Sequence, residues 1–231
     1  MPEPRIALVI PALNEEQAIA QVLDGLPPGL FARVVVVDNG STDATAAVAR
    51  SHGAEVVPEP RRGYGQACLA GLAALGRDPD IIAFMDADGS DAPAEVVSLL
   101  EPILRNDSDL VIGSRALGKA EPGSLTWPQR WGNRLSVALI HLLFGHRYTD
   151  LGPFRAIRRE SLELLGMRDT NFGWTVEMQI RAHRQALRVM ELPTAYRRRK
   201  LGESKISGTI RGSVAAGAKI LWTIAKYRFV D

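Results

Sequence analysis

Two aspartates separated by one residue follow an apolar segment of the sequence. Residues 81–85 have the length and composition of a buried strand, and Asp86 and Asp88 follow directly, with Asp91 just beyond. Two carboxylates held this close together are costly to keep ionised unless a cation lies between them. Mg²⁺ is commonly held by one or two carboxylates together with substrate phosphates, and Mn²⁺ also prefers oxygen ligands. We therefore interpret Asp86 and Asp88 as ligands of Mg²⁺ or Mn²⁺ that hold a diphosphate; the alternative is a polar turn.

Acidic side chains also follow the first two predicted strands, residues 5–10 and 33–37. Glu15 lies in the turn after the first strand, and Asp38 ends the second. The carboxyl ends of parallel strands meet at one edge of a sheet, and ligands bind there. Carboxylates at that edge can accept hydrogen bonds from a base and from ribose hydroxyls, which favours a nucleotide as the ligand.

The turns of the sequence do not match two common nucleotide-binding motifs. A dinucleotide-binding fold would place G-x-G-x-x-G after the first strand, whereas residues 11–15 are Pro-Ala-Leu-Asn-Glu. The phosphate-binding motif G-x-x-x-x-G-K-[ST] does not occur either. Residues 61–65, Arg-Arg-Gly-Tyr-Gly, could contact a phosphate or a base, but an ordinary turn fits them equally well.

Strands and helices alternate over the first half of the chain. Strands are predicted at residues 5–10, 33–37, 55–57, 81–85 and 109–113, and helices at about 14–26, 44–50, 67–75 and 93–105. The predicted N-caps of these helices are Asn14, Ser41 or Thr42, and Asp91. Such an alternation predicts an α/β fold with a doubly wound, mostly parallel sheet and a Rossmann-like nucleotide-binding half.

The alternation ends after Leu117. A loop is predicted at residues 118–127, helices at 130–144, 175–185 and 206–229, and strands at 156–157, 188–192 and 195–199. No linker or internal repeat is present, so residues 1–231 are predicted to form a single domain.

Charge is unevenly distributed along the chain. Residues 1–120 carry 9 Lys and Arg against 17 Asp and Glu, a net charge of −8, whereas residues 121–231 carry a net charge of +10. A metal on one side and an anionic ligand on the other would explain this asymmetry, to which ordinary solvated surface can contribute. We expect no nucleic-acid partner.

The sequence also bears on location. Cys68 is the single cysteine, which excludes an internal disulfide and favours a reducing compartment. We expect no signal peptide before the first strand, and the longest apolar segment, residues 135–144, is about half the ~20 residues needed to span a bilayer. We expect a cytoplasmic protein and leave a peripheral contact with a membrane surface open.

A basic segment near the end of the chain is a second candidate for binding anions. Residues 197–205 contain five Lys or Arg together with Gly202 and Ser204, and could close on a diphosphate leaving group. The alternative is a solvated basic loop. Arg115 and Arg155 are further candidates, each of which could instead belong to a structural ion pair.

Six short motifs occur in register: Pro-Ala-Leu-Asn-Glu at 11–15, Val-Asp-Asn-Gly-Ser-Thr-Asp at 37–43, Asp-Ala-Asp at 86–88, Gly-Ser-Arg at 113–115, Asp-Leu-Gly-Pro-Phe-Arg at 150–155 and Arg-x-x-Gly-x-Ser-Lys at 199–205. The series resembles the family-two GT-A glycosyltransferases, and within them the polyprenyl-phosphate (dolichyl-phosphate) mannose or glucose synthase branch. The resemblance covers nearly the whole chain. It implies inverting transfer of a sugar from a GDP- or UDP-linked donor with Mg²⁺ or Mn²⁺. Residues 1–117 would be the nucleotide- and metal-binding half and residues 118–231 the acceptor-side half.

The resemblance also assigns roles to residues. The substrate-binding candidates are Pro11, Asn14, Glu15, Asp38, Asn39, Arg115, Asp150, Arg155, Ser204 and Lys205. The catalytic candidates are Asp88, Glu177 and Arg199, and the metal ligands are Asp86 and Asp88, with Ser90 or Asp91 as a further one. The sequence departs from the family pattern at Asn39, where a second Asp is common, and at residues 150–155, a compressed form of the usual segment.

The acceptor is less well specified. An alcohol needs a general base, usually a carboxylate, whereas a phosphate monoester with a second pKa of about 6 is already largely ionised. Family members with hydroxyl acceptors often present Glu-Asp at a helix start, but the chain offers only Glu177, which could be a base, position the acceptor or interact with the helix dipole. With the basic second half, this favours a lipid phosphate; the alternative is a soluble hydroxyl acceptor with Glu177 as base.

The closing helix is amphipathic. One face carries Ile210, Val214, Leu221, Ile224 and Ala225, with Lys219 and Lys226 opposite and Trp222 at the flank. This pattern suits a helix on a membrane surface and equally a helix packed on the sheet.

Two other classes of protein fit less well. A sugar-nucleotide pyrophosphorylase would have a loop rich in glycine and arginine after the first strand, and that loop is absent from the sequence. A non-catalytic nucleotide-sugar-binding subunit would not need acids at positions 38, 86 and 88, where the chain retains all three.

Overall fold

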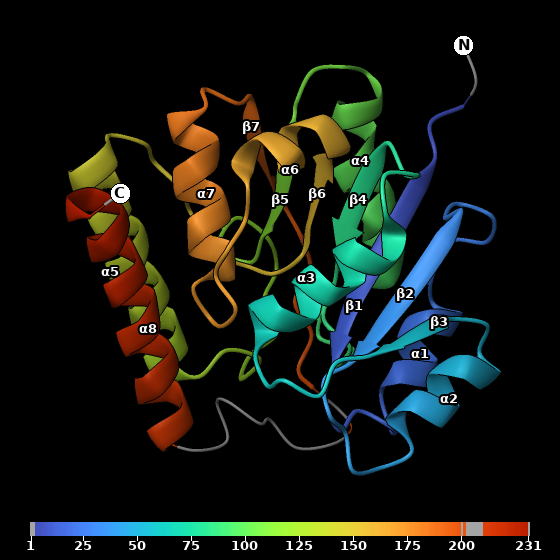
Figure 1. The fold of residues 1–231 in the computed structure, drawn as a ribbon. Helices are drawn as coiled ribbons and strands as arrows, with labels where there is room; N and C mark the ends of the chain where they lie inside the picture. The colour runs from blue at the N-terminus through green and yellow to red at the C-terminus, as the bar shows by residue number, and fades with distance from the viewer. Residues whose placement is uncertain (1–2, 200, 202–209, 231) are drawn as a thin grey trace.

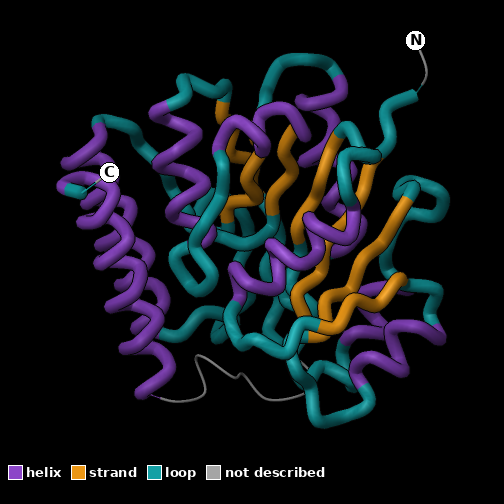
Figure 2. Tube along the Cα trace, in the orientation of Figure 1, coloured by secondary structure: helices purple, strands orange, loops and turns teal. Residues whose placement is uncertain are grey.

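A seven-stranded sheet runs through the molecule and carries helices on both faces (Figures 1 and 2). The computed structural model describes residues 3–199, 201 and 210–230. The strands are β1 (Ile6–Ala12), β2 (Arg33–Asp38), β3 (Glu55–Pro58), β4 (Ile81–Phe84), β5 (Leu110–Ser114), β6 (Arg155–Arg158) and β7 (Val189–Pro193). Their order is β3-β2-β1-β4-β6-β5-β7, and only β6 is antiparallel to its neighbours. The predicted α/β fold with a mostly parallel sheet is therefore confirmed.

The helices divide between the two faces of the sheet. One face is covered by α1 (Ile19–Asp24), α2 (Thr45–Ser51) and α4 (Val96–Leu104), the last preceded by the short 3-10 helix η1 (Pro93–Glu95). The other face is covered by α3 (Tyr64–Leu75), α6 (Arg159–Leu165) and α7 (Trp174–Arg184). Two long helices, α5 (Trp127–Phe144) and α8 (Ile210–Phe229), lie side by side beyond α7 at the edge of the molecule (Figure 1).

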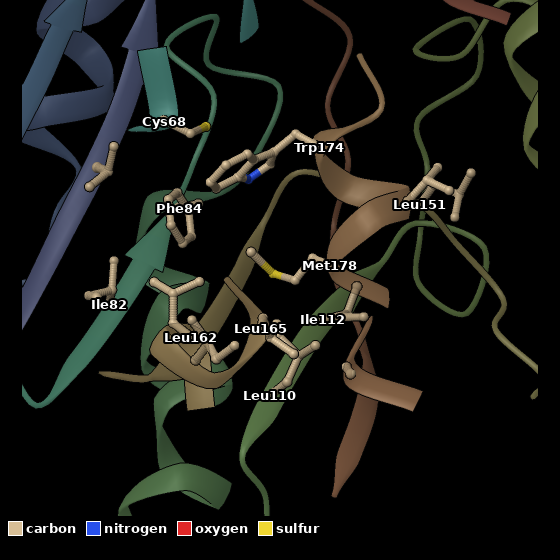
Figure 3. Packing of buried hydrophobic residues seen from close by; sticks show 14 of the residues in the cluster. Cys68, Ile82, Phe84, Leu110, Ile112, Leu151, Leu162, Leu165, Trp174 and Met178 are labelled. Carbon is tan, nitrogen blue, oxygen red and sulfur yellow. The ribbon is translucent and has the colours of Figure 1, made fainter. Parts of the chain in front are cut away.

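Strand β4 is buried on both faces. Consecutive residues of a strand point to opposite sides, so Ala83 packs under α4 whereas Ile82 and Phe84 belong to the core under α3 and α7 (Figure 3). In that core the ring of Phe84 meets the ring of Trp174 edge-on, with 6.1 Å between the centroids. This packing fixes the point at which the acidic residues leave the carboxyl end of β4.

The predicted N-caps are wrong, because the side chains concerned connect loops instead. Asn14 has a φ of 53°, and its Oδ1 accepts a hydrogen bond from the backbone N–H of Thr42 at 2.8 Å. The Oγ of Ser41 accepts a bond from the backbone N–H of Asn14 at 2.9 Å. Helix α1 begins only at Ile19, and Asp91, the expected cap of the helix after β4, is buried. The polar residues Asn14 and Ser41 therefore connect two loops to each other and do not cap a helix.

Other elements of the second half also differ from the prediction. Residues 195–199 form no strand; Tyr196 makes only isolated bridges to two other loops. Helix α6 occupies a segment where no helix was predicted. Ser204, Lys205 and residues 206–209, the expected start of the last helix, lie outside the described residues. Within the described part of the chain, none of the helices has the length and apolar character needed to cross a bilayer.

Gly71 lets α3 approach the sheet closely, which gives a test of the packing. A Cβ at Gly71 would lie 2.6 Å from Cγ1 of Val9 and 3.1 Å from Cγ2 of Val37. Gly71→Ala should lower the free energy of unfolding by about 1–3 kcal/mol, the usual cost of overpacking a core. The control is Gly132→Ala in α5, where a Cβ meets nothing within 4 Å and alanine should raise stability by about 0.5–1 kcal/mol. Urea unfolding measures the free energy of unfolding of both variants. If the two substitutions changed it by the same amount, the close approach of α3 to the sheet would not be what excludes a side chain at Gly71.

Candidate active site

A cavity of about 420 Å³ opens at the carboxyl ends of β1, β2 and β4. This is the edge of the sheet at which the sequence analysis places the ligand. The predicted site residues that line it are Pro11, Glu15, Asn39, Asp86, Asp88 and Arg199. The loops after three neighbouring strands and the segment after β7 therefore converge on one cavity.

Three aspartates follow β4. Asp86 and Asp88 line the cavity, and Asp91 is buried, with 2 % of its surface exposed. Backbone hydrogen bonds hold the turn: the N–H of Ser90 donates to Oδ1 of Asp88 at 2.9 Å, and the N–H of Asp86 donates to Oδ2 of Asp91 at 3.5 Å. The turn thus gathers three carboxyl groups at the end of one strand.

Burial and mutual repulsion raise the pKa values of these acids. Burial, followed by the charges of Asp88 and Asp91, holds the pKa of Asp86 well above its usual value. Burial and the charge of Asp88 raise the pKa of Asp91 to about 7, although Arg115 acts in the opposite direction. A divalent cation bound by Asp86 and Asp88 would offset this repulsion, so the oxygen-only donor set fits Mg²⁺ or Mn²⁺ with substrate phosphates as further ligands. Among the described residues, no cluster of three or more His, Cys, Asp or Glu is arranged to hold a metal alone.

Asn39 organises the loop that forms the cavity wall after β3. Its Nδ2 donates to the backbone carbonyls of Glu59 at 2.9 Å and Arg61 at 2.7 Å, and its Oδ1 accepts from the N–H of Gly63 at 2.9 Å. Asn39 therefore shapes the wall of the cavity, with its amide engaged by the protein. Asp38 is half-buried, and its Oδ1 accepts a bond from the N–H of Ser41 at 2.9 Å.

Arg62, Gly63 and Tyr64, from the segment 61–65 that the sequence analysis named as a possible ligand contact, also line the cavity. Asn171 and Phe172 line it as well, and the sequence analysis did not identify these two. The loop that carries Asn171 and Phe172 contacts the start of α3 so closely that a Cβ on Gly65 would lie 2.0 Å from the carbonyl oxygen of Asp169. Gly65 is thus required by a segment about a hundred residues away. The Gly-Tyr-Gly sequence was the one local signal of this contact, and it also fits a plain turn.

Arg199, in the segment after β7, contacts the loop after β1. Its guanidinium forms an ion pair with the carboxylate of Glu15, and both side chains are largely buried. The pair lies in the same cavity as Asp86 and Asp88. A cation from the segment after β7 therefore reaches the acidic site.

Arg115 and Asp150 form a two-pronged ion pair. The Nη2 and Nε atoms of Arg115 lie 2.6 and 2.7 Å from the two carboxylate oxygens of Asp150, and the N–H of Arg115 donates to Oδ2 at 2.7 Å. The guanidinium also lies over the ring of Tyr196, 5.1 Å from its centroid. The structural ion pair left open for Arg115 is therefore present, with Asp150 as its partner.

The same pair borders a second cavity of about 530 Å³. Its other walls come from the loop before α5, the first half of α5, and α8. Two exposed cations of α5, Arg130 and Arg134, lie on its border, and Leu125, Leu151 and Ile220 supply apolar surface. Arg115 also lowers the pKa of Asp86 and Asp91, so its charge acts on the acidic site while its side chain lines the second cavity.

Comparison with known proteins places this architecture. The profile described as "Glycosyl transferase family 2" matches residues 7–166. The chain belongs to glycosyltransferase family 2. It is 41% identical over 215 residues to an uncharacterized glycosyltransferase of Mycobacterium tuberculosis, covering 91% of this chain and 94% of the relative. It is 33% identical over 227 residues to the undecaprenyl-phosphate mannosyltransferase of Micrococcus luteus, with 90% of each chain covered, and 34% identical over 222 residues to the dolichyl-phosphate hexose transferase of Haloferax volcanii, with 94% and 92% covered.

Solved structures show the same fold. Glucosyl-3-phosphoglycerate synthase from Mycobacterium tuberculosis, crystallised with Mn²⁺, uridine diphosphate and glucosyl-3-phosphoglycerate, superimposes with a TM-score of 0.76 at 24% identity. The match covers 99% of this chain and 81% of that one. Another crystal structure of that enzyme, with Mg²⁺ and uridine diphosphate, gives a TM-score of 0.76 at 23% identity. The predictions of an enzyme, of the family and of the GT-A fold are confirmed.

Two predicted site residues of the glycosyltransferase lie in the interior. Arg155 is fully buried and donates to the backbone carbonyls of Thr175, at 3.2 Å, and Gly152; burial lowers its pKa to about 10. Glu177 is also fully buried, and its carboxylate joins α7 to α8 by accepting bonds from Arg181 at 3.1 Å and from the Tyr227 hydroxyl. Neither lines either cavity. The structure therefore brings neither Arg155 nor Glu177 to a cavity, and in their present positions both side chains support the packing. A role of Arg155 in substrate binding and of Glu177 as general base stays a prediction.

The raised pKa of Asp91 gives a test of the acidic cluster. Its folded-state pKa of about 7 exceeds the usual value of about 3.9. The proton therefore stabilises the folded state at low pH, and this contribution is lost as the pH rises from about 4 to about 7. In metal-free buffer, Asp91→Asn should unfold about 3–6 °C above wild type at about pH 8, with the difference closing towards pH 4.

The control for this measurement is Asp107→Asn, which changes an exposed carboxylate and should leave the melting temperature unaltered at both pH values. A wild-type protein more stable than Asp91→Asn at pH 8 would contradict the assignment of repulsion to this cluster.

Proposed function

We propose that this chain is a metal-dependent inverting glycosyltransferase that moves a sugar from a GDP- or UDP-linked donor to a polyprenyl phosphate. The observation that carries the proposal is the position of Asp86 and Asp88 in the cavity at the end of β4. The names of two relatives, an undecaprenyl-phosphate mannosyltransferase and a dolichyl-phosphate hexose transferase, support the acceptor class. A cytoplasmic location stays a prediction from the sequence.

The donor would occupy the first cavity. Asp86 and Asp88 would hold Mg²⁺ or Mn²⁺, and when bound the cation neutralises the diphosphate that leaves. Arg199 is ion-paired with Glu15 in the same cavity, and its planar guanidinium can exchange that carboxylate for phosphate oxygens. Ser204 and Lys205, which lie outside the described residues, would extend this anion site as the family resemblance implies.

The acceptor would occupy the second cavity. Arg130 and Arg134 offer charge to a phosphate, and the apolar walls suit the first units of a prenyl chain. Of the described residues on this border, Asp150 is the one carboxylate, and Arg115 engages both of its oxygens. An alcohol would therefore find no general base there, whereas a phosphate monoester needs none near neutral pH because its second pKa is about 6.

The relation of the two cavities also supports the proposal. An inverting displacement needs the attacking oxygen and the leaving diphosphate on opposite sides of the anomeric carbon. Arg115 lines the acceptor cavity and acts electrostatically on Asp86 in the donor cavity. The sugar would then lie near Arg115, with the lipid phosphate on one side and the nucleotide on the other.

Asp88→Asn tests the donor side of the proposal. Loss of one charged ligand should lower sugar transfer by about 100-fold or more, because the leaving diphosphate is no longer neutralised. We also expect Mn²⁺ with UDP or GDP to raise the melting temperature of wild type, and this increase should be absent in the variant. The measurements are release of nucleoside diphosphate from a panel of GDP- and UDP-sugars with a polyprenyl phosphate, and thermal unfolding with each nucleotide.

Asp107→Asn again serves as the matched control, since it removes an exposed carboxylate away from the cavity lining. It should retain full transfer and the full nucleotide effect. Wild-type activity in Asp88→Asn, or an equal loss in both variants, would contradict the metal site.

Arg134→Ala tests the acceptor side. Removing one charge-assisted hydrogen bond to phosphate should raise the KM for polyprenyl phosphate by about tenfold or more while the KM for the donor stays unchanged. Arg147→Ala, an exposed arginine just after α5, is the control and should leave both values unchanged. An equal rise of the donor KM in Arg134→Ala would place the acceptor elsewhere, and transfer to a polyprenol without phosphate would contradict the acceptor class.

A further inference from the structure

Helix α5 exposes a stripe of large apolar side chains. Trp127, Trp131, Leu135 and Leu142 recur at helical spacing, so they share one face, and they are between 48 % and 77 % exposed. The rings of Trp127 and Trp131 lie 5.7 Å apart on this surface. Scattered exposed apolar residues are normal, but an aligned row with two tryptophans marks a surface that has a partner.

Helix α8 adds a second row. Leu221, Trp222 and Phe229 are exposed, whereas Ile224 and Tyr227 are buried in the core. The apolar face expected from the sequence is therefore split: Ile224 packs inward, whereas Leu221 of that face and Trp222 at its flank are exposed. Because α5 and α8 lie side by side at the edge of the molecule, both rows belong to one end of it (Figure 1).

The charge of these helices is of one sign. Neither α5 nor α8 contains an Asp or a Glu. Arg130 and Arg134 flank the row on α5, and Arg228 lies beside Phe229 on α8, all three exposed. Aromatic side chains together with arginines are typical of helices that lie in the headgroup region of anionic bilayers.

We propose that the exposed faces of α5 and α8 bind the surface of an anionic lipid bilayer. A second copy of this chain is a poorer partner, because a two-fold interface would place the same arginines against each other. The inference deepens the proposed function by naming the membrane as a partner. It rests on the proposed function in one respect, namely that a lipid acceptor would reside in that membrane. Arg130 of α5 and Ile220 of α8 border the acceptor cavity, so a bilayer on this face would lie next to its opening.

Vesicle flotation tests the inference with the full chain and no substrate. Wild type should float with phosphatidylcholine vesicles that contain about 30 % phosphatidylglycerol and remain unbound with pure phosphatidylcholine, since each basic residue near an anionic surface adds to binding. Trp131→Glu and Trp222→Glu should each weaken binding to the anionic vesicles by about tenfold or more. The control is Leu164→Glu on α6, which changes a residue of comparable exposure, 56 %, and should bind like wild type.

Tryptophan emission, flotation, light scattering and sugar transfer together separate the outcomes. Tryptophan emission should shift to the blue with anionic vesicles, because Trp127, Trp131 and Trp222 are exposed while Trp174 is already buried. Equal flotation of wild type and both tryptophan variants would overturn the inference, and so would a concentration-dependent dimer in light scattering that Trp131→Glu abolishes. Asp88→Asn should float like wild type; vesicle binding without any sugar transfer would refute the proposed function alone, and transfer without vesicle binding would refute this inference alone.

Discussion

The crowding of carboxyl groups at the end of β4 is the constraint on which the site depends. Asp86, Asp88 and Asp91 are gathered by a turn whose backbone amides bind two of the carboxylates. Their repulsion and burial favour protonation, and Arg115 offsets the effect only in part because Asp150 shares its charge. A further cation bound by these carboxylates would offset their repulsion, so binding of such a cation should stabilise the folded protein.

The loops around this cluster are held by side chains rather than by regular secondary structure. Asn39 connects to three backbone groups of the segment after β3, and Asn14 connects the loops after β1 and β2. Such bonds fix the cavity wall where strands have already ended and the backbone would otherwise lack partners. Gly65 contributes differently, since its missing side chain allows the loop with Phe172 to close the cavity from the far end of the chain.

The sequence predicts the strands of the first half and the position of the acidic motif because both are local: apolar segments of strand length followed by acids. It could not predict that Glu177 and Arg155 are interior, since a charged residue in a motif looks the same whether its partners are a substrate or buried backbone groups. Nor could it reveal Tyr64 and Phe172 as neighbours, because that contact joins distant segments. The expected strand over residues 195–199 fails for a related reason: its bonding groups meet loops, not a sheet edge.

Helix α8 packs against the segment that forms part of the first cavity. Its inner face is held by the bond from Tyr227 to Glu177 and by the ion pair of Lys219 with Asp169, 2.8 Å apart. Asp169 in turn accepts a bond from the N–H of Asn171, which lines the cavity beside Phe172. The packing of α8 therefore helps to position the loop of Asn171 and Phe172 in the wall of the first cavity, although the two elements lie about 50 residues apart in the sequence.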